Sequence, residues 1–210
     1  YGIPNFEKAR YSATNILTLV AERTIQPYKR EASNNKYNEY HLFELPWPTE
    51  ILREELTNHD VTLKVTLSYF IEPNPGERRY ANNFQYHSHS LEFAVIKPQE
   101  RLEVFQRRIS AASNLAPDEI DNRGENWLIG SRIRSRGSVK KDFITMSGAD
   151  LAQCKYLAIY PKNGWYKTRK KINKVDSVVR YSLIVSLETD NNEIDIYTPI
   201  ELKLRNVLPV

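Results

Sequence analysis

The stretch Val61-Thr62-Leu63-Lys64-Val65-Thr66-Leu67-Ser68-Tyr69 has an apolar residue at every odd position and a polar residue at every even position. Because successive side chains of a strand point to opposite faces, this pattern predicts a strand with one face on a core and the other in water. The alternation returns in 179–187, with Ile184 as the exception, and again in 194–204. Asp190-Asn191-Asn192 lies between those two runs and predicts a hairpin turn.

Weaker patterns complete the expected fold. They predict strands in 17–25, 37–45, 90–96, 127–133 and 155–160, a helix in 101–113, short helices in 49–56 and 147–154, and the end of a longer helical unit in 5–13. Long loops are expected in 72–87, 114–126 and 162–174. Short alternating strands with few helices predict a mainly all-β chain, an antiparallel β-sandwich of jelly-roll type with one or two peripheral helices. A parallel sheet would require unbroken apolar runs, which the sequence lacks.

Composition agrees with a globular domain that has its own core. The 210 residues are 40% hydrophobic and 27% charged, and folding a chain of this size removes roughly 70% of its surface from water. The single cysteine, Cys154, excludes an intramolecular disulfide and favours a cytoplasmic location over a secreted one. No apolar run reaches the length of a membrane-spanning helix, so no membrane partner is expected.

Residues suited to catalysis or metal binding are few. The chain has four histidines (His41, His59, His87 and His89) and no Gly-x-Ser-x-Gly motif, and Cys154 is expected to pack rather than react. His87-Ser88-His89 would place two imidazoles on one face of a strand, with Glu72 and Glu92 as further ligands. A zinc site needs three or four ligands, so we predict no metal. Because no recognisable nucleophile motif is present either, we predict no catalytic residue and no cofactor in this chain.

One segment is strongly basic. Residues 132–174 contain twelve Lys or Arg and two acidic residues, against a net charge of +4 for the whole chain. This segment predicts a binding face formed by Arg132, Arg134, Arg136, Lys140, Lys141, Trp165, Tyr166, Lys167, Arg169, Lys170 and Lys171. The alternative function is therefore a nucleic-acid- or carbohydrate-binding module, with Trp47 and Trp165 as carbohydrate platforms. Nucleic acid is disfavoured by the modest overall charge, and a basic run is also typical of a solvated loop or of a surface that docks on an acidic neighbour.

The first residues, Tyr1-Gly2-Ile3-Pro4-Asn5-Phe6-Glu7-Lys8-Ala9, resemble the close of a subtilisin-like (subtilase) serine protease domain. The rest of the chain is similar to the C-terminal region of a bacterial subtilase subgroup. That similarity lies in Leu45-Pro46-Trp47-Pro48, in 65–76, in Ala158-Ile159-Tyr160-Pro161 with Gly164-Trp165, and in the stretch from Arg180-Tyr181-Ser182-Leu183 to Asp195-Ile196-Tyr197-Thr198-Pro199.

The resemblance implies a non-catalytic role. In subtilases the catalytic Asp, His and Ser and the oxyanion-hole Asn all precede this point, so none maps onto a residue of this chain. Residues 1–14 would be the tail of an upstream protease domain, packed through Ile3, Phe6 and Tyr11, and 15–210 an accessory domain. That domain would brace the protease, limit access to its cleft, or recruit a protein or peptide substrate or partner. Related modules sometimes bind calcium, but a turn explains Asp190-Asn191-Asn192 equally well.

Overall fold

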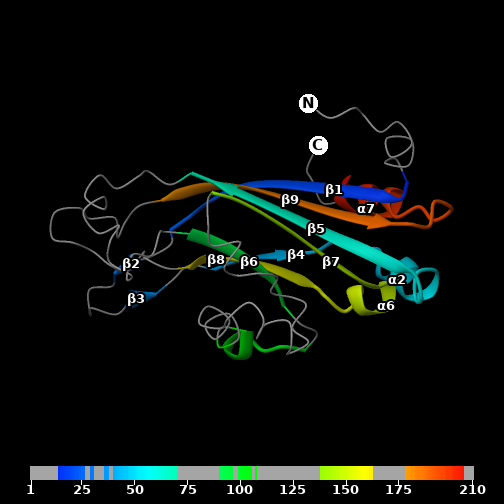
Figure 1. The fold of residues 1–210 in the computed structure, drawn as a ribbon, viewed down its shortest axis with the longest axis horizontal. Coiled ribbons are helices and arrows are strands. Elements are labelled where there is room, and N and C mark those ends of the chain that lie inside the picture. The colour runs from blue at the N-terminus through cyan, green and yellow to red at the C-terminus, as the bar shows by residue number, and fades with distance from the viewer. Residues whose placement is uncertain are drawn as a thin grey trace, which may run out of the picture.

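The chain folds into two antiparallel sheets packed face to face (Figure 1). The computed structural model describes residues 14–26, 29–30, 36–37, 40–70, 90–96, 99–105, 107, 138–162 and 178–205. Sheet 1 consists, in spatial order, of β1 (Ile16–Ile25), β9 (Val179–Thr189), β5 (Asp60–Tyr69) and β7 (Val139–Ser147). Sheet 2 consists of β4 (His41–Glu44), β8 (Tyr156–Lys162) and β6 (Ser90–Val95), and β2 (Lys29–Arg30) pairs with β3 (Lys36–Tyr37).

The strand order is that of a jelly roll. Three antiparallel pairs are nested around the middle of the chain: β1 with β9, β4 with β8, and β5 with β7. Two further pairs, β5 with β9 and β6 with β8, arise when this nested hairpin is rolled into two layers. The expected antiparallel sandwich of jelly-roll type is therefore the observed fold.

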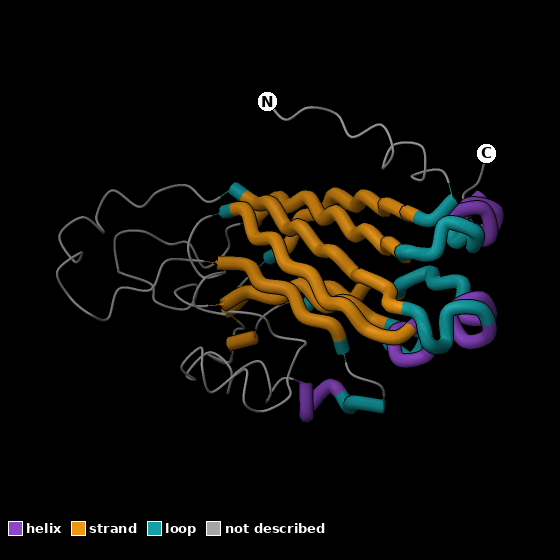
Figure 2. Tube along the Cα trace, turned by 45° about the vertical axis from the view of Figure 1, so that its right-hand side comes forward, coloured by secondary structure: helices purple, strands orange, loops and turns teal. Residues whose placement is uncertain are grey.

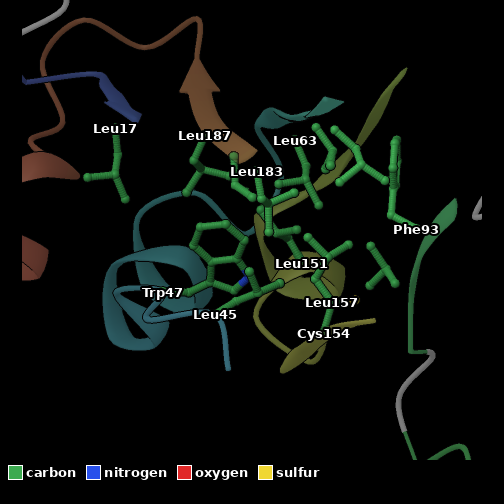
Figure 3. Close-up of a cluster of buried hydrophobic side chains, with 14 of the residues drawn as sticks. Leu17, Leu45, Trp47, Leu63, Phe93, Leu151, Cys154, Leu157, Leu183 and Leu187 are labelled. Carbon is green, nitrogen blue, oxygen red and sulfur yellow. The ribbon is translucent and has the colours of Figure 1, made fainter. Parts of the chain in front are cut away.

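The core lies between the two sheets. The odd-numbered side chains of β5, from Val61 to Tyr69, are all buried, as are those of β9 from Val179 to Thr189. Opposite them, Leu91, Phe93 and the side chains of β8 at 157 and 159 close the core from sheet 2. Figure 3 shows how Trp47 and Leu151 fill the space beside the strands. Burying one such side chain contributes about 1.5–3 kcal/mol to the free energy of unfolding, so the packing of the two sheets is a main source of stability.

The two ends of the sandwich differ. At one end, which we call the helical end, lie α2 (Thr49–Glu54), α6 (Gly148–Leu151) and α7 (Tyr197–Arg205), as Figure 2 shows. At the opposite end, the loop end, β1 and β5 finish and β4, β6, β7 and β9 begin. The connections from β1 to β4, from β5 to β6 and from β8 to β9 therefore all leave from the loop end.

The outer face of sheet 2 is covered. Ala94, Ala158 and Tyr160 point away from the main core and form a second buried cluster with Phe105. The rings of Phe105 and Tyr160 meet edge to face at 6.1 Å, and Tyr40 stacks on Tyr160 at 6.2 Å. Because both faces of this sheet are buried, β6 and β8 lack the polar alternation that β5 and β9 show.

The predicted strand over 194–204 is wrong. A turn does follow β9, with Asn191 N–H donating to Thr189 Oγ1, but the chain then enters α7 instead of forming a hairpin. Asp195 Oδ1 accepts from the backbone N–H groups of Tyr197 and Thr198, both at 2.9 Å, which is the contact of a helix N-cap. Pro199 suits the first turn of a helix, so the local signals favoured a helix over the apparent alternation.

Other predictions are met in part. Strands at 17–25, 90–96 and 155–160 and short helices at 49–56 and 147–154 correspond to β1, β6, β8, α2 and α6. The strand expected at 37–45 is confined to β4 and the end of β3, and 102–105 with 107 form the described part of the helix expected at 101–113. The elements expected at 5–13 and 127–133, the loops at 72–87 and 114–126, and the loop expected at 162–174 apart from its first residue lie outside the described residues. That first residue, Lys162, is the end of β8. Within the part of the chain that is described, no helix is long and apolar enough to cross a membrane.

Candidate functional site

Most of the expected basic face falls outside the described residues. Only Lys140 and Lys141 of that set are described, and they are neighbours on β7. Their side chains point to opposite faces, so Lys141 is exposed whereas Lys140 points into the sandwich and is buried. Lys140 is therefore not part of an exposed binding face. Arg132, Arg134, Arg136, Trp165, Tyr166, Lys167, Arg169, Lys170 and Lys171 are among the residues that are not described.

Lys140 forms an ion pair between the two sheets. Its Nζ lies 2.5 Å from Oε1 of Glu92 on β6, and the two side chains are 0% and 2% exposed. The Lys140 ammonium also lies 6.0 Å from the centre of the Tyr69 ring. Burial raises the pKa of the Tyr69 hydroxyl, a hydrogen bond with the backbone of Leu91 lowers it, and the charge of Glu92 raises it further. Tyr69 therefore stays neutral beside the charged pair.

A second polar contact joins the sheets near the loop end. His41 Nδ1 of β4 lies 2.6 Å from the hydroxyl of Tyr181 on β9, and Phe43 meets the Tyr181 ring edge-on at 6.4 Å. Tyr181 is the cross-strand partner of Tyr69, so this contact and the Lys140–Glu92 pair lie in the same part of the sandwich. The other described histidine, His59, is exposed at the helical end. The two histidines therefore do not share a site.

Cys154 and Trp47 are core residues. Burial raises the pKa of the Cys154 thiol to about 12, with a further contribution from the charge of Asp150, and Sγ donates to the Asp150 carbonyl at 3.3 Å. A thiol with so high a pKa is a poor nucleophile, which agrees with the packing role expected for it. Trp47 is 3% exposed and its indole Nε1 has no hydrogen-bond partner. The suggestion that Trp47 lines a carbohydrate groove is therefore wrong.

No metal centre is formed by the described residues. Nowhere among them do three or more His, Cys, Asp or Glu side chains gather as a metal site requires. Glu92, one of the suggested ligands, is paired with Lys140 instead. His87, His89 and Glu72 lie outside the described part of the chain.

Thr14 and Asn15, the two residues before β1, form a hydrogen-bonded junction with the rest of the sandwich. Sequence reasoning did not single them out. The Thr14 carbonyl accepts from the N–H groups of Ile196 and Tyr197, at 2.8 and 3.2 Å. Asn15 is buried, and its Nδ2 donates to the Thr189 carbonyl at 3.1 Å and to Asn192 Oδ1 at 2.9 Å. These bonds tie the start of β1 to the corner between β9 and α7. Their partners are more than 170 residues apart in the sequence, so no local pattern reveals them.

Comparison with known proteins assigns no family. No family model and no curated protein matches the chain. Among solved structures, one similar chain comes from a full particle of Israeli acute paralysis virus heated to 63 degrees. It is 14% identical, the match covers 88% of this chain and 76% of that one, and the TM-score is 0.30. A likeness this weak carries no argument about function.

Proposed function

We propose that this chain is a non-catalytic accessory domain of a subtilisin-like serine endopeptidase, and that it braces the protease domain that precedes it in the same polypeptide. The resemblance of Tyr1–Ala9 to the close of a subtilase domain supplies the identity of the upstream partner. Under this proposal, peptide-bond hydrolysis belongs to upstream residues, and 15–210 contribute stability and position.

The observation that carries the bracing role is the junction at Thr14 and Asn15. A flexible linker would leave the two domains free to move, which is the usual situation when few contacts cross a domain boundary. Here the last residues before β1 are instead held by five hydrogen bonds to the β9–α7 corner. The Thr14 carbonyl accepts two, the Asn15 carbonyl accepts one from the Thr189 N–H, and the Asn15 side-chain amide donates two. The point at which a preceding domain is attached, Thr14, is therefore fixed relative to the sandwich.

The test uses a fluorophosphonate probe, which labels activated serine nucleophiles, on the full-length polypeptide and on the isolated 1–210 chain. Labelling of a serine upstream of Tyr1, with no labelling of 1–210, is the expected result. Peptide cleavage or labelling by purified 1–210 would overturn the proposal, as would a full-length polypeptide whose upstream part contains no serine that the probe labels.

A further inference from the structure

No described residue covers the outer face of sheet 1, and this face carries several exposed apolar side chains. Val20, Phe143 and Ile184 lie at outward positions of β1, β7 and β9, and they are 67%, 60% and 40% exposed. Val139 at the start of β7 is also outward and exposed. Phe70 and Val178, immediately beyond the ends of β5 and β9, continue this series.

The registers place these residues on one surface. Val20 is the cross-strand partner of Ile184, and Ile184 is the partner of Thr66 on β5. Phe143 lies opposite Lys64 and Val139 opposite Ser68, so the apolar residues lie on β1, β9 and β7, on either side of the polar outward side chains of β5. The outer face of sheet 2 differs, because Phe105 and Tyr40 cover its apolar side chains. Exposed apolar residues gathered on one face and surrounded by polar ones are typical of interaction sites.

Several of the polar groups on this face are paired with one another. Thr18 bonds Ser186 and Thr62 bonds Thr145, both at 3.0 Å, and Ser182 donates to Glu22 at 3.2 Å. Lys64 forms an ion pair with Glu188. Polar groups that are paired in this way lose little when a protein covers them, since their hydrogen bonds stay within the chain. This pattern, with both signs of charge interspersed, fits a protein partner better than a polyanion.

We propose that the outer face of sheet 1 is the surface on which the upstream protease domain packs. This inference rests on the proposed function. Its geometric basis is the junction, because Ile16, the first residue of β1, lies at the rim of the face immediately after Thr14 and Asn15. The 13 residues before Thr14 reach at most about 45 Å even when fully extended, so a domain attached through them stays within reach of this face. Such tethering gives an effective concentration on the order of millimolar, so a modest apolar surface is enough.

The size of the face also fits. Four strands about 4.8 Å apart and roughly ten residues long, at about 3.3 Å per residue, give an area of roughly 600 Å². Interfaces between domains of one chain start at about this area and are more polar than obligate interfaces. The mixture of Val, Ile and Phe with paired Thr and Ser side chains on this face has that character.

The experiment measures the accessibility of a single engineered thiol. Val20→Cys is compared with Leu42→Cys, which lies on β4 and is 48% exposed, and each is introduced into the full-length polypeptide and into isolated 1–210. Cys154 is buried and adds little background. We expect a maleimide to label Val20→Cys at least tenfold more slowly in the full-length polypeptide than in 1–210, and to label Leu42→Cys at similar rates in both.

Disruption completes the test. Val20→Lys with Ile184→Lys should separate the domains and make the upstream domain more sensitive to limited proteolysis, whereas the control pair Leu42→Lys with Val104→Lys should not. Equal labelling of Val20→Cys in both contexts would overturn the inference, and it would leave the proposed function standing if the fluorophosphonate probe still labels the upstream domain. A labelling rate that falls with the concentration of isolated 1–210 would assign the face to a second copy and also overturn it. If Val20→Cys is protected from maleimide in a full-length polypeptide that the fluorophosphonate probe does not label, the proposed function is overturned, and so is the protease domain as the occupant of the face.

Discussion

Lys140 on β7 and Glu92 on β6 form a buried ion pair that connects the two sheets, although 48 residues separate them in the sequence. Burying two charges costs several kcal/mol per ion, and the attraction between them repays this only when the geometry is good. β7 ends the described strand order of sheet 1, and an inward-pointing charge on such a strand discourages pairing with another chain at that edge. We infer that this pair helps to specify which strands face each other more than it adds stability.

The first prediction concerns that pair. Lys140→Met and Glu92→Leu should each destabilise the chain by about 3–5 kcal/mol, because each leaves an uncompensated buried charge. The double variant should recover most of the loss, since two apolar side chains fill the same space without charge. Denaturant unfolding of the three variants measures this, with Lys141→Met, which is exposed on the same strand, as the control. A double variant that is as unstable as the sum of the two single variants would contradict this account of the pair.

Gly148, at the start of α6, is predicted to tolerate no side chain. A Cβ there would lie 2.4 Å from the Leu56 carbonyl and 2.6 Å from that of Leu52, so the backbone after α2 would have to move. Gly148→Ala should cost about 1–3 kcal/mol through overpacking. Thermal unfolding compared with Gln153→Ala, an exposed position in the same connection, tests this. An unchanged melting temperature would show that α2 and α6 are not in close contact.

The start of α7 should make stability depend on pH through Asp195. Burial alone would raise the pKa of this carboxyl, but hydrogen bonds from Thr198 and Tyr197 outweigh burial and lower it. Because the pKa is lower in the folded chain, the stabilisation is present above the unfolded value of about 3.9 and is lost as the pH falls through the folded pKa.

Two substitutions separate the cap from the charge of Asp195. Asp195→Ala should cost about 1 kcal/mol at neutral pH, whereas Asp195→Asn should keep the cap and lose only the acid dependence. Urea unfolding at pH 7 and below pH 4 distinguishes them. Equal losses for the two variants at pH 7 would rule out capping as the contribution of this residue.

Cys154 should react with thiol reagents only when the chain unfolds. Its thiol is buried and has a pKa of about 12, so almost no thiolate is present at neutral pH. The rate of iodoacetamide labelling should therefore rise steeply across the urea unfolding transition and remain very low before it. Rapid labelling of the folded chain would show that the α6–β8 connection opens without global unfolding.

The elements that sequence patterns predicted well are those with one wet and one dry face. β5 and β9 have their odd-numbered residues in the core and their partners in water, which gives the alternation directly. β7 was not predicted because the first half of its pattern is inverted: Val139 and Phe143 point outward while Lys140 and Asp142 occupy inward positions. The run 194–204 shows the opposite error, since the N-cap at Asp195 and Pro199 outweighed an alternation that fits a strand only formally.

The candidate site was less accessible to sequence reasoning than the fold. The Lys140–Glu92 pair, the His41–Tyr181 contact and the bonds of Asn15 all join residues from different strands, and they depend on how two sheets stack. A lysine in a basic run is usually exposed, so composition placed Lys140 on the surface. Whether position 140 of β7 faces inward or outward is decided by the register of β7 with β5, and this register places Lys140 inward.

The central claim, that this chain braces an upstream protease domain through a fixed junction, is tested most directly at Asn15. Asn15→Asp is nearly isosteric but replaces the donor that faces the Thr189 carbonyl and Asn192 Oδ1 with an acceptor, at a cost of about 1–3 kcal/mol. Asn192→Asp keeps an acceptor at the other end of the same bond and is the matched control. The measurement is the half-life, at elevated temperature, of fluorophosphonate labelling by the full-length polypeptide. The account predicts a half-life several-fold shorter for Asn15→Asp and little changed for Asn192→Asp. The account would be contradicted if Asn15→Asp lowered the unfolding temperature of isolated 1–210 but left the labelling half-life of the full-length polypeptide unchanged.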